Sequence, residues 1–265
     1  MPWSRRSATP RSGGVMARGD LGRHVFGLAS IAFGVFSLVF HDFNIWQPLG
    51  PLGSGALHDA LLDLYALAVM FGGLAVQWRK TARTGALVLS VTYAIFAVLW
   101  LPRWLVKPQS YDPLGNFFEQ FSLVCGALMV FASTRRDAQR RTLERSSYYG
   151  FALCVVSFTL EQLFYLHGTA KFVPRWIPPG QMFWAVATTI AFALAAVALL
   201  TGRFALPAAR LTAAMIAGFG LLVWLPAPFA QPHSLTAWAG NAENAAIGAS
   251  AWIVAEYLSR TRSTG

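Results

Sequence analysis

Long apolar segments are the feature of this sequence that most constrains its fold. Eight stretches of roughly 20 mostly apolar residues follow one another along the chain, separated by short polar connections. We expect each to be a membrane-spanning helix, because these runs are continuous and lack the alternation of a barrel strand. The expected spans are residues 24–42, 57–77, 84–104, 116–133, 148–167, 182–201, 208–225 and 241–258.

The composition also indicates a membrane protein. Only 12% of the residues are charged, half of the roughly 25% of soluble domains, and the mean hydropathy is +0.48. The net charge is +10, but Lys and Arg do not gather on a polar domain, so we expect a lipid bilayer and no nucleic acid as the partner. Cys125 and Cys154 lie in apolar runs without a C-x-x-C pair, which predicts buried thiols.

The distribution of cations predicts an orientation. Of the 21 Lys and Arg, 17 fall in the two tails and in the second, fourth and sixth connections. The other four are Arg103, Lys107, Lys171 and Arg175. The positive-inside rule therefore predicts a multi-pass protein of the bacterial inner membrane with both termini cytoplasmic. The outer connections are rich in Pro and Trp, which suggests a rigid surface or a cap over a cavity.

An internal repeat divides the chain. A shift of 124 residues aligns Trp100-Leu101-Pro102 with Trp224-Leu225-Pro226 and Glu119 with Glu243, and a shift of 126 aligns His41 with His167. We predict an all-α membrane protein of eight transmembrane helices, as two repeated four-helix bundles related by a pseudo-two-fold along the membrane normal. The expected parts are a disordered basic tail (1–20), the first repeat (21–133), an Arg-rich cytoplasmic linker (134–147), the second repeat (148–258) and a C-terminal tail (259–265).

Both halves, and so nearly the whole chain after residue 20, resemble the DoxX-like family of bacterial membrane proteins, most strongly in the second half. The resemblance lies in Tyr165-Leu166-His167-Gly168-Thr169-Ala170, in residues 173–179 and 241–255, and in the Trp-Leu-Pro before each outer loop. It implies a four-helix membrane bundle, here duplicated. Some relatives resemble membrane subunits of quinone-linked oxidoreductases, which implies a quinone as a candidate cofactor and an oxidoreductase subunit as a candidate partner. Many others have no assigned activity.

Ionisable side chains inside the expected spans are the candidate site, because each costs about 2.5–3.5 kcal/mol at the bilayer centre. All of them fall in the expected outer half of the membrane and predict a polar cavity in each half, or one shared between the halves. The candidates are Asp59, Asp63, Glu119, Glu161, Glu243, His41 and His167. Glu119 and Glu243 would be repeat-related anchors, with His41 and His167 as their partners. The simpler alternative places Glu119 and Glu243 in the first turns of their helices, where the dipole favours a carboxylate.

Three functions fit this pattern. The first is a DoxX-like component of a quinone-linked redox system, the second a transporter or binder of a small solute at a site between the repeats, and the third a non-catalytic membrane scaffold. The sequence carries no catalytic signature, so we expect no catalytic activity of the chain's own. No spacing matches a metal site or a bis-histidine haem site, so the sequence indicates no resident cofactor other than a quinone. Glycines such as Gly72 and Gly73 predict close helix packing.

Overall fold

The fold is helical throughout its regular part. The computed structural model describes residues 20–43 and 55–262, and it contains no strand in those ranges. The helices are α1 (Leu21–Phe40), α2 (Ala56–Ala75), α3 (Ala82–Val106), α4 (Asp112–Ser133), α5 (Gln139–Phe164), α6 (Leu166–Phe172), α7 (Gln181–Thr201), α8 (Ala205–Phe219), the π-helix η2 (Gly220–Trp224), α9 (Ala227–Ala230) and α10 (Leu235–Arg262).

Most of these helices are suited to a membrane. Among the described residues, α1, α2, α3, α4, α7 and the stretch Ala205–Ala230 are long and apolar enough to cross one. Helices α5 and α6 qualify together as a seventh segment, although they meet at an angle of 94°. The chain is therefore compatible with a polytopic membrane protein. Helix α10 has 28 residues but is not among the candidate spans, so the eighth span stays a prediction.

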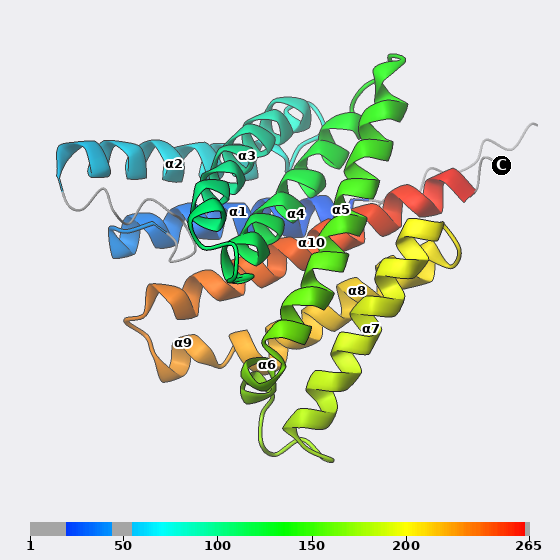
Figure 1. Cartoon of the computed structure of the whole chain (residues 1–265). Helices are drawn as coiled ribbons and strands as arrows, with labels where there is room; N and C mark the ends of the chain where they lie inside the picture. Colours follow the sequence, from blue (N-terminus) through cyan, green and yellow to red (C-terminus); the bar gives the residue numbers. More distant parts are fainter. Residues whose placement is uncertain (1–19, 44–54, 263–265) are drawn as a thin grey trace, which may run out of the picture.

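The long helices form a closed ring of neighbours (Figure 1). Helix α1 packs on α2, α2 on α3, α3 on α4, α4 on α5, α5 on α7, α7 on α8 and α8 on α10, which returns to α1. Helices α4 and α10 also pack against each other across the ring. Side chains of these two helices therefore meet in the interior of the bundle.

Glycines allow several of these helices to approach closely, as the sequence predicts. A Cβ atom on Gly73 of α2 would lie 2.4 Å from the carbonyl oxygen of Gly27 in α1, and one on Gly72 would meet Leu89 of α3 at 2.7 Å. At the crossing of α4 and α10, a Cβ on Gly126 would lie 2.3 Å from the hydroxyl of Ser250. Backbones this close gain van der Waals contact that larger residues would prevent.

The expected linker is mostly helical. Helix α5 begins at Gln139, so residues 139–147 form its first turns and only residues 134–138 connect it to α4. Arg and Glu are good helix formers, and Arg140 donates a hydrogen bond to Glu144 one turn later at 2.9 Å. The basic segment thus extends the bundle at the expected cytoplasmic end.

Three parts of the chain meet at one end of the bundle. The backbone N–H of Gly22 in α1 donates to Glu256 near the end of α10 (3.2 Å), and Arg79 between α2 and α3 forms an ion pair with Asp20 (2.8 Å). The start of α1, this connection and the end of α10 therefore share one end. The cation pattern requires this arrangement, whichever way the bundle faces in a membrane.

Enlarging a glycine at a helix crossing should destabilise the fold. We expect Gly73→Ala to lower the free energy of unfolding by about 1–3 kcal/mol, because its methyl group would collide with the backbone of α1. The matched control is Gly218→Ala in α8, where a Cβ meets nothing within 4 Å. Thermal unfolding of both variants in detergent checks this, and equal midpoints would contradict the packing.

Candidate functional site

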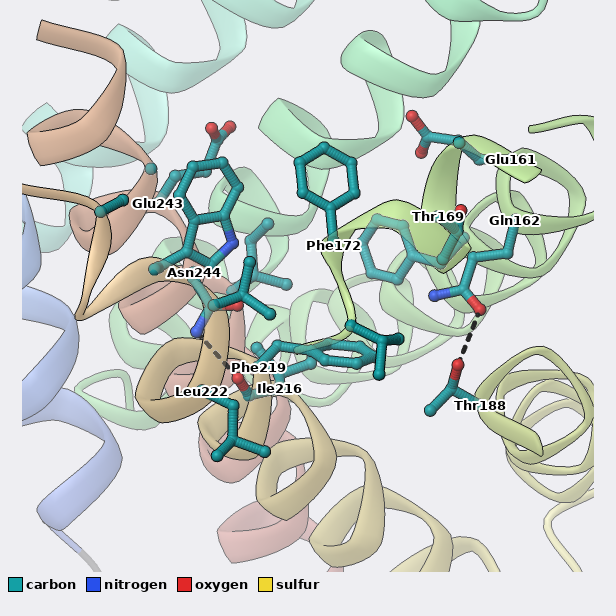
Figure 2. Close-up of a pocket in the computed structure, with 18 of the residues that line it drawn as sticks. Glu161, Gln162, Thr169, Phe172, Thr188, Ile216, Phe219, Leu222, Glu243 and Asn244 are labelled. Carbon is teal, nitrogen blue, oxygen red and sulfur yellow. Dashed lines mark hydrogen bonds between the residues drawn. The ribbon is translucent and has the colours of Figure 1, made fainter. Parts of the chain in front are cut away.

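The main cavity lies in the second half of the chain. It has a volume of about 800 Å³ and is lined by residues of α5, α6, α7, α8, η2, α9 and α10, with Glu119 contributed by α4 (Figure 2). We call it the carboxylate cavity, because Glu119, Glu161 and Glu243 all line it. The part of the chain that the structure describes adds no Lys or Arg to this lining. Three of the sequence candidates are thus brought together.

The three carboxyl groups lie within electrostatic range of one another. Glu119 interacts with both Glu161 and Glu243, and Glu161 also interacts with Glu243. In Figure 2, Glu161 and Glu243 lie on the two sides of Phe172. Like charges held together in apolar surroundings repel strongly, so this arrangement favours a proton or a cation between them.

Glu243 is held by a hydrogen bond across the α4–α10 contact. Its side chain is buried, with 5% of the residue exposed, and its Oε1 accepts a hydrogen bond from Nε2 of Gln120 at 2.9 Å. Gln120 is 1% exposed. This pair satisfies two polar groups that would otherwise be costly in the interior, and it fixes one wall of the cavity.

Glu161 lies against the backbone of α4. A Cβ atom on Gly115 would lie 3.0 Å from the Glu161 carboxyl group, so only glycine leaves ordinary room for that group. Tyr111, just before α4, donates a hydrogen bond to the hydroxyl of Ser157 at 2.9 Å. Ser157 lies one turn before Glu161 in α5. These contacts join the start of α4 to the last turns of α5 beside the cavity.

The first-turn positions expected for Glu119 and Glu243 are wrong. Helix α4 begins at Asp112 and α10 at Leu235, so both glutamates lie about two turns inside their helices. Asp112 occupies the first turn of α4 instead, next to Pro113. The helix dipole therefore does not account for the two glutamates, because its effect falls off within the first turn.

Aromatic side chains make up much of the remaining wall. They are Phe158, Tyr165, Phe172, Trp184, Phe192, Phe219 and Trp224. Between them lie a few polar groups, and Gln162 accepts hydrogen bonds from Thr188 (3.3 Å, Figure 2) and Thr189 (3.0 Å). A large apolar surface with a few fixed polar groups is the usual lining of a small-molecule site.

Two helix breaks open the space for the cavity. Helix α5 ends at Phe164 and the chain turns through 94° into α6. Helix α8 passes into the π-helix η2, where the N–H of Leu225 donates to the carbonyl of Gly220 at 2.7 Å. Asn244 of α10 bonds to the carbonyl of Ile216 at 2.8 Å (Figure 2), which satisfies a backbone group near this break. Such π segments are frequent at functional sites.

The connection between α6 and α7 forms part of the cavity wall. Pro174 and Ile177 line the cavity, and the connection is fastened to α7 by hydrogen bonds from Trp184 to the carbonyl of Pro178 (3.0 Å) and from Gln181 to that of Val173 (2.6 Å). The Pro- and Trp-rich segment thus contributes to the cavity, and its expected role as a cap stays a prediction. Its counterpart before α2 lies within residues 44–54, outside the described residues.

The other candidate residues lie apart from the carboxylate cavity. Nε2 of His41, at the end of α1, lies 3.3 Å from Oδ1 of Asp59, and Nδ1 of His58 lies 3.2 Å from the same oxygen. Asp63 is exposed on α2, and His167 is exposed on α6 next to lining residue Gly168. The expected pairing of His41 and His167 with Glu119 and Glu243 is therefore not formed.

Several site residues are not predicted by the sequence pattern. Gln120 and Asn244 were not singled out, although the shift of 124 residues aligns them with each other just as it aligns Glu119 with Glu243. The signal available in the sequence was an amide side chain directly after each repeat-related glutamate, Glu119 and Glu243. The aromatic wall had no such signal, because Phe and Trp in apolar helices are ordinary packing residues.

No group of three or more His, Cys, Asp or Glu side chains in the described ranges could hold a metal ion. Comparisons of the sequence with protein-family models, with curated proteins and with solved structures give no match.

Removing the donor to Glu243 should destabilise the protein. We expect Gln120→Leu to cost about 1–3 kcal/mol of unfolding free energy, because the buried carboxyl group loses its hydrogen bond. The double variant Gln120→Leu/Glu243→Leu should cost less, because both partners are then apolar. Gln231→Leu, at an exposed cavity residue, serves as the control. Chemical denaturation in detergent measures all three, and a double variant that loses at least as much stability as Gln120→Leu would refute the pairing.

Proposed function

We propose that this chain is a polytopic inner-membrane protein that binds a small lipophilic cation in the carboxylate cavity. One observation carries the proposal: three carboxyl groups, of Glu119, Glu161 and Glu243, line one cavity, and the described lining contains no Lys or Arg. A ligand with a positive charge would relieve this repulsion, whereas an anion would increase it. The proposal makes the chain a binder or transporter of a solute rather than an enzyme.

The aromatic wall supports the same ligand. Trp and Tyr faces attract ammonium groups through their ring quadrupoles, most strongly when the cation is desolvated, and Trp184, Trp224 and Tyr165 all line the cavity. The rest of the lining is apolar, which suits a hydrophobic body on the same molecule. The proposed ligand class is therefore an aromatic or alkyl amine or quaternary ammonium.

The protein should bind a charged ligand more tightly than its neutral isostere. We expect purified protein to bind trimethylphenylammonium and to bind tert-butylbenzene, which has the same shape, much more weakly. Glu119→Gln, Glu161→Gln and Glu243→Gln should each weaken binding of the ammonium at least about tenfold, because each removes one partner of a buried charge pair. Quenching of tryptophan fluorescence measures both ligands.

The control for this experiment is Asp63→Asn, which removes a carboxylate that does not line the cavity. It should leave the affinity for the ammonium unchanged. Equal affinity for the two isosteres, or equal losses in Asp63→Asn and the three glutamate variants, would contradict the proposal.

A quinone-linked role is the second candidate. The DoxX-like resemblance carries it, together with an apolar cavity in which carboxyl groups could exchange protons with a quinol headgroup. It predicts a quinone that co-purifies with the protein and a soluble or membrane oxidoreductase subunit as partner. A neutral quinone would displace both tert-butylbenzene and the ammonium from the cavity. Competition by a quinone therefore distinguishes the quinone-linked role from the first proposal.

The duplicated architecture with eight spans belongs to the same proposal. It is supported by the ring of neighbours, in which α1, α2, α3 and α4 have the same contacts as α5, α7, α8 and α10. It is also supported by Gly55 and Gly180, 125 residues apart, which precede α2 and α7 with similar dihedral angles (φ 151° and 144°, ψ 175° and 168°). Helix α10 would then be the eighth span, with its polar residues turned toward α4 and α8.

The proposed orientation places the Arg-rich end in the cytoplasm. We expect Gln139→Cys to react with a membrane-impermeant maleimide only after cells are opened, and Gln109→Cys, at the opposite end, to react in intact cells. Both side chains are exposed, and the native Cys125 and Cys154 are buried, so background labelling should be low. Labelling of residue 139 in intact cells would refute the orientation.

A further inference from the structure

A second cavity lies at the Arg-rich end of the bundle. It has a volume of about 460 Å³ and is bordered by the start of α1, the α2–α3 connection, the ends of α4 and α10 and the start of α5. Six arginines among the described residues line it, and we call it the arginine basin. They are Arg23, Arg79, Arg135, Arg136, Arg140 and Arg260.

The geometry points to the arginine basin as a binding site for a phosphate group. Guanidinium groups offer planar pairs of donors that match phosphate oxygens, and this basin gathers them from helices far apart in the sequence. Only two carboxylates, Asp20 and Glu256, belong to its described lining. Two more, Asp137 and Glu144, pair with lining arginines, so arginines still outnumber the carboxylates.

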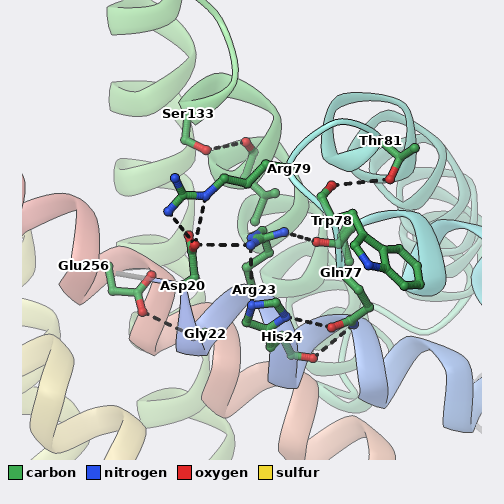
Figure 3. A network of polar contacts seen from close by, with 12 residues as sticks. Asp20, Gly22, Arg23, His24, Gln77, Trp78, Arg79, Thr81, Ser133 and Glu256 are labelled. Carbon is green, nitrogen blue, oxygen red and sulfur yellow. Dashed lines mark hydrogen bonds and ion pairs between the residues drawn. The ribbon is translucent and has the colours of Figure 1, made fainter. Parts of the chain in front are cut away.

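Part of this basin is rigidly built (Figure 3). Nε and Nη2 of Arg79 donate to Oδ2 of Asp20 at 3.2 and 2.8 Å, and Nη2 of Arg23 lies 3.3 Å from the same oxygen. Arg23 is 8% exposed and also donates to the backbone carbonyl of Val76. Two guanidinium groups are therefore oriented before any ligand arrives, which lowers the entropic cost of binding.

Asp20 acts as the anchor for these arginines. Burial alone would raise the pKa of its carboxyl group, but the hydrogen bond from Arg79 and the charges of Arg23 and Arg79 hold that pKa below its ordinary value. Asp20 is therefore ionised at neutral pH and keeps both arginines in place. Arg136 is exposed at the rim, and no carboxylate of the described ranges lies within ion-pair distance of it.

Two sources could supply the phosphate. Basic pockets at the ends of membrane helices bind anionic headgroups, and the basin lies where the helices would leave a membrane. A soluble phosphate compound from the aqueous side would meet the same guanidinium groups. The chemistry of recognition is shared, so the experiment has one arm for each source.

The test uses full-length protein and two matched double variants. Arg135→Gln/Arg136→Gln removes two charges from the basin, and Arg141→Gln/Arg145→Gln removes two charges from the same segment outside it. In one arm, calorimetry in a neutral detergent measures glycerol 3-phosphate. In the other, native mass spectrometry measures phosphatidylglycerol retained from mixed micelles with phosphatidylcholine.

We expect the wild type to bind at least one probe, the basin variant to lose at least about tenfold in affinity and the control variant less than about twofold. Arg135→Lys/Arg136→Lys should lie between them, because it keeps the charge but loses the planar donors. Binding in one arm alone would identify the source of the phosphate. Equal losses in the two double variants, or no binding of either probe by the wild type, would overturn the proposal.

Discussion

The requirement that polar groups in an apolar environment find partners organises this protein. The hydrogen bond between Gln120 and Glu243 joins α4 to α10 in the interior of the ring of helices. Around it Glu119, Glu161 and Glu243 converge on one cavity, whereas six arginines line the cavity at the other end. The two cavities thus differ in charge among the described residues: carboxyl groups without a Lys or Arg line the first, and arginines outnumber carboxylates in the second.

Much of the fold could be predicted from the sequence, because the apolar runs and the charged connections can be recognised from residue types alone. The positions of the helices follow the apolar runs, and the grouping of the Arg-rich connections at one end follows from helix alternation. That Glu119, Glu161 and Glu243 share a cavity could also be predicted. The positions of Glu119 and Glu243 within their helices could not, because α4 and α10 begin several residues before their apolar runs, at Asp112 and Leu235.

The structure also shows what a single sequence conceals. The sharp bend after Phe164 and the π-helix η2 have no strong local signal, yet they make the space that the aromatic residues line. The first half keeps α3 continuous through Pro102, whereas the aligned Pro226 follows a break. Similar sequences in the two halves thus give different outer ends. His41 and Asp59 meet in the first half, away from the carboxylates of the second.

We propose that the carboxylate cavity receives a cation and that the bundle around it lies in a membrane. The most direct measurement is an experimental structure of the protein in lipid nanodiscs with trimethylphenylammonium added. We expect ligand density between Glu119, Glu161 and Glu243, with the ammonium facing the carboxyl groups, and a lipid belt around the exposed apolar faces of α2 and α7. A cavity filled by neighbouring side chains, or an ammonium bound elsewhere with this cavity empty, would contradict it.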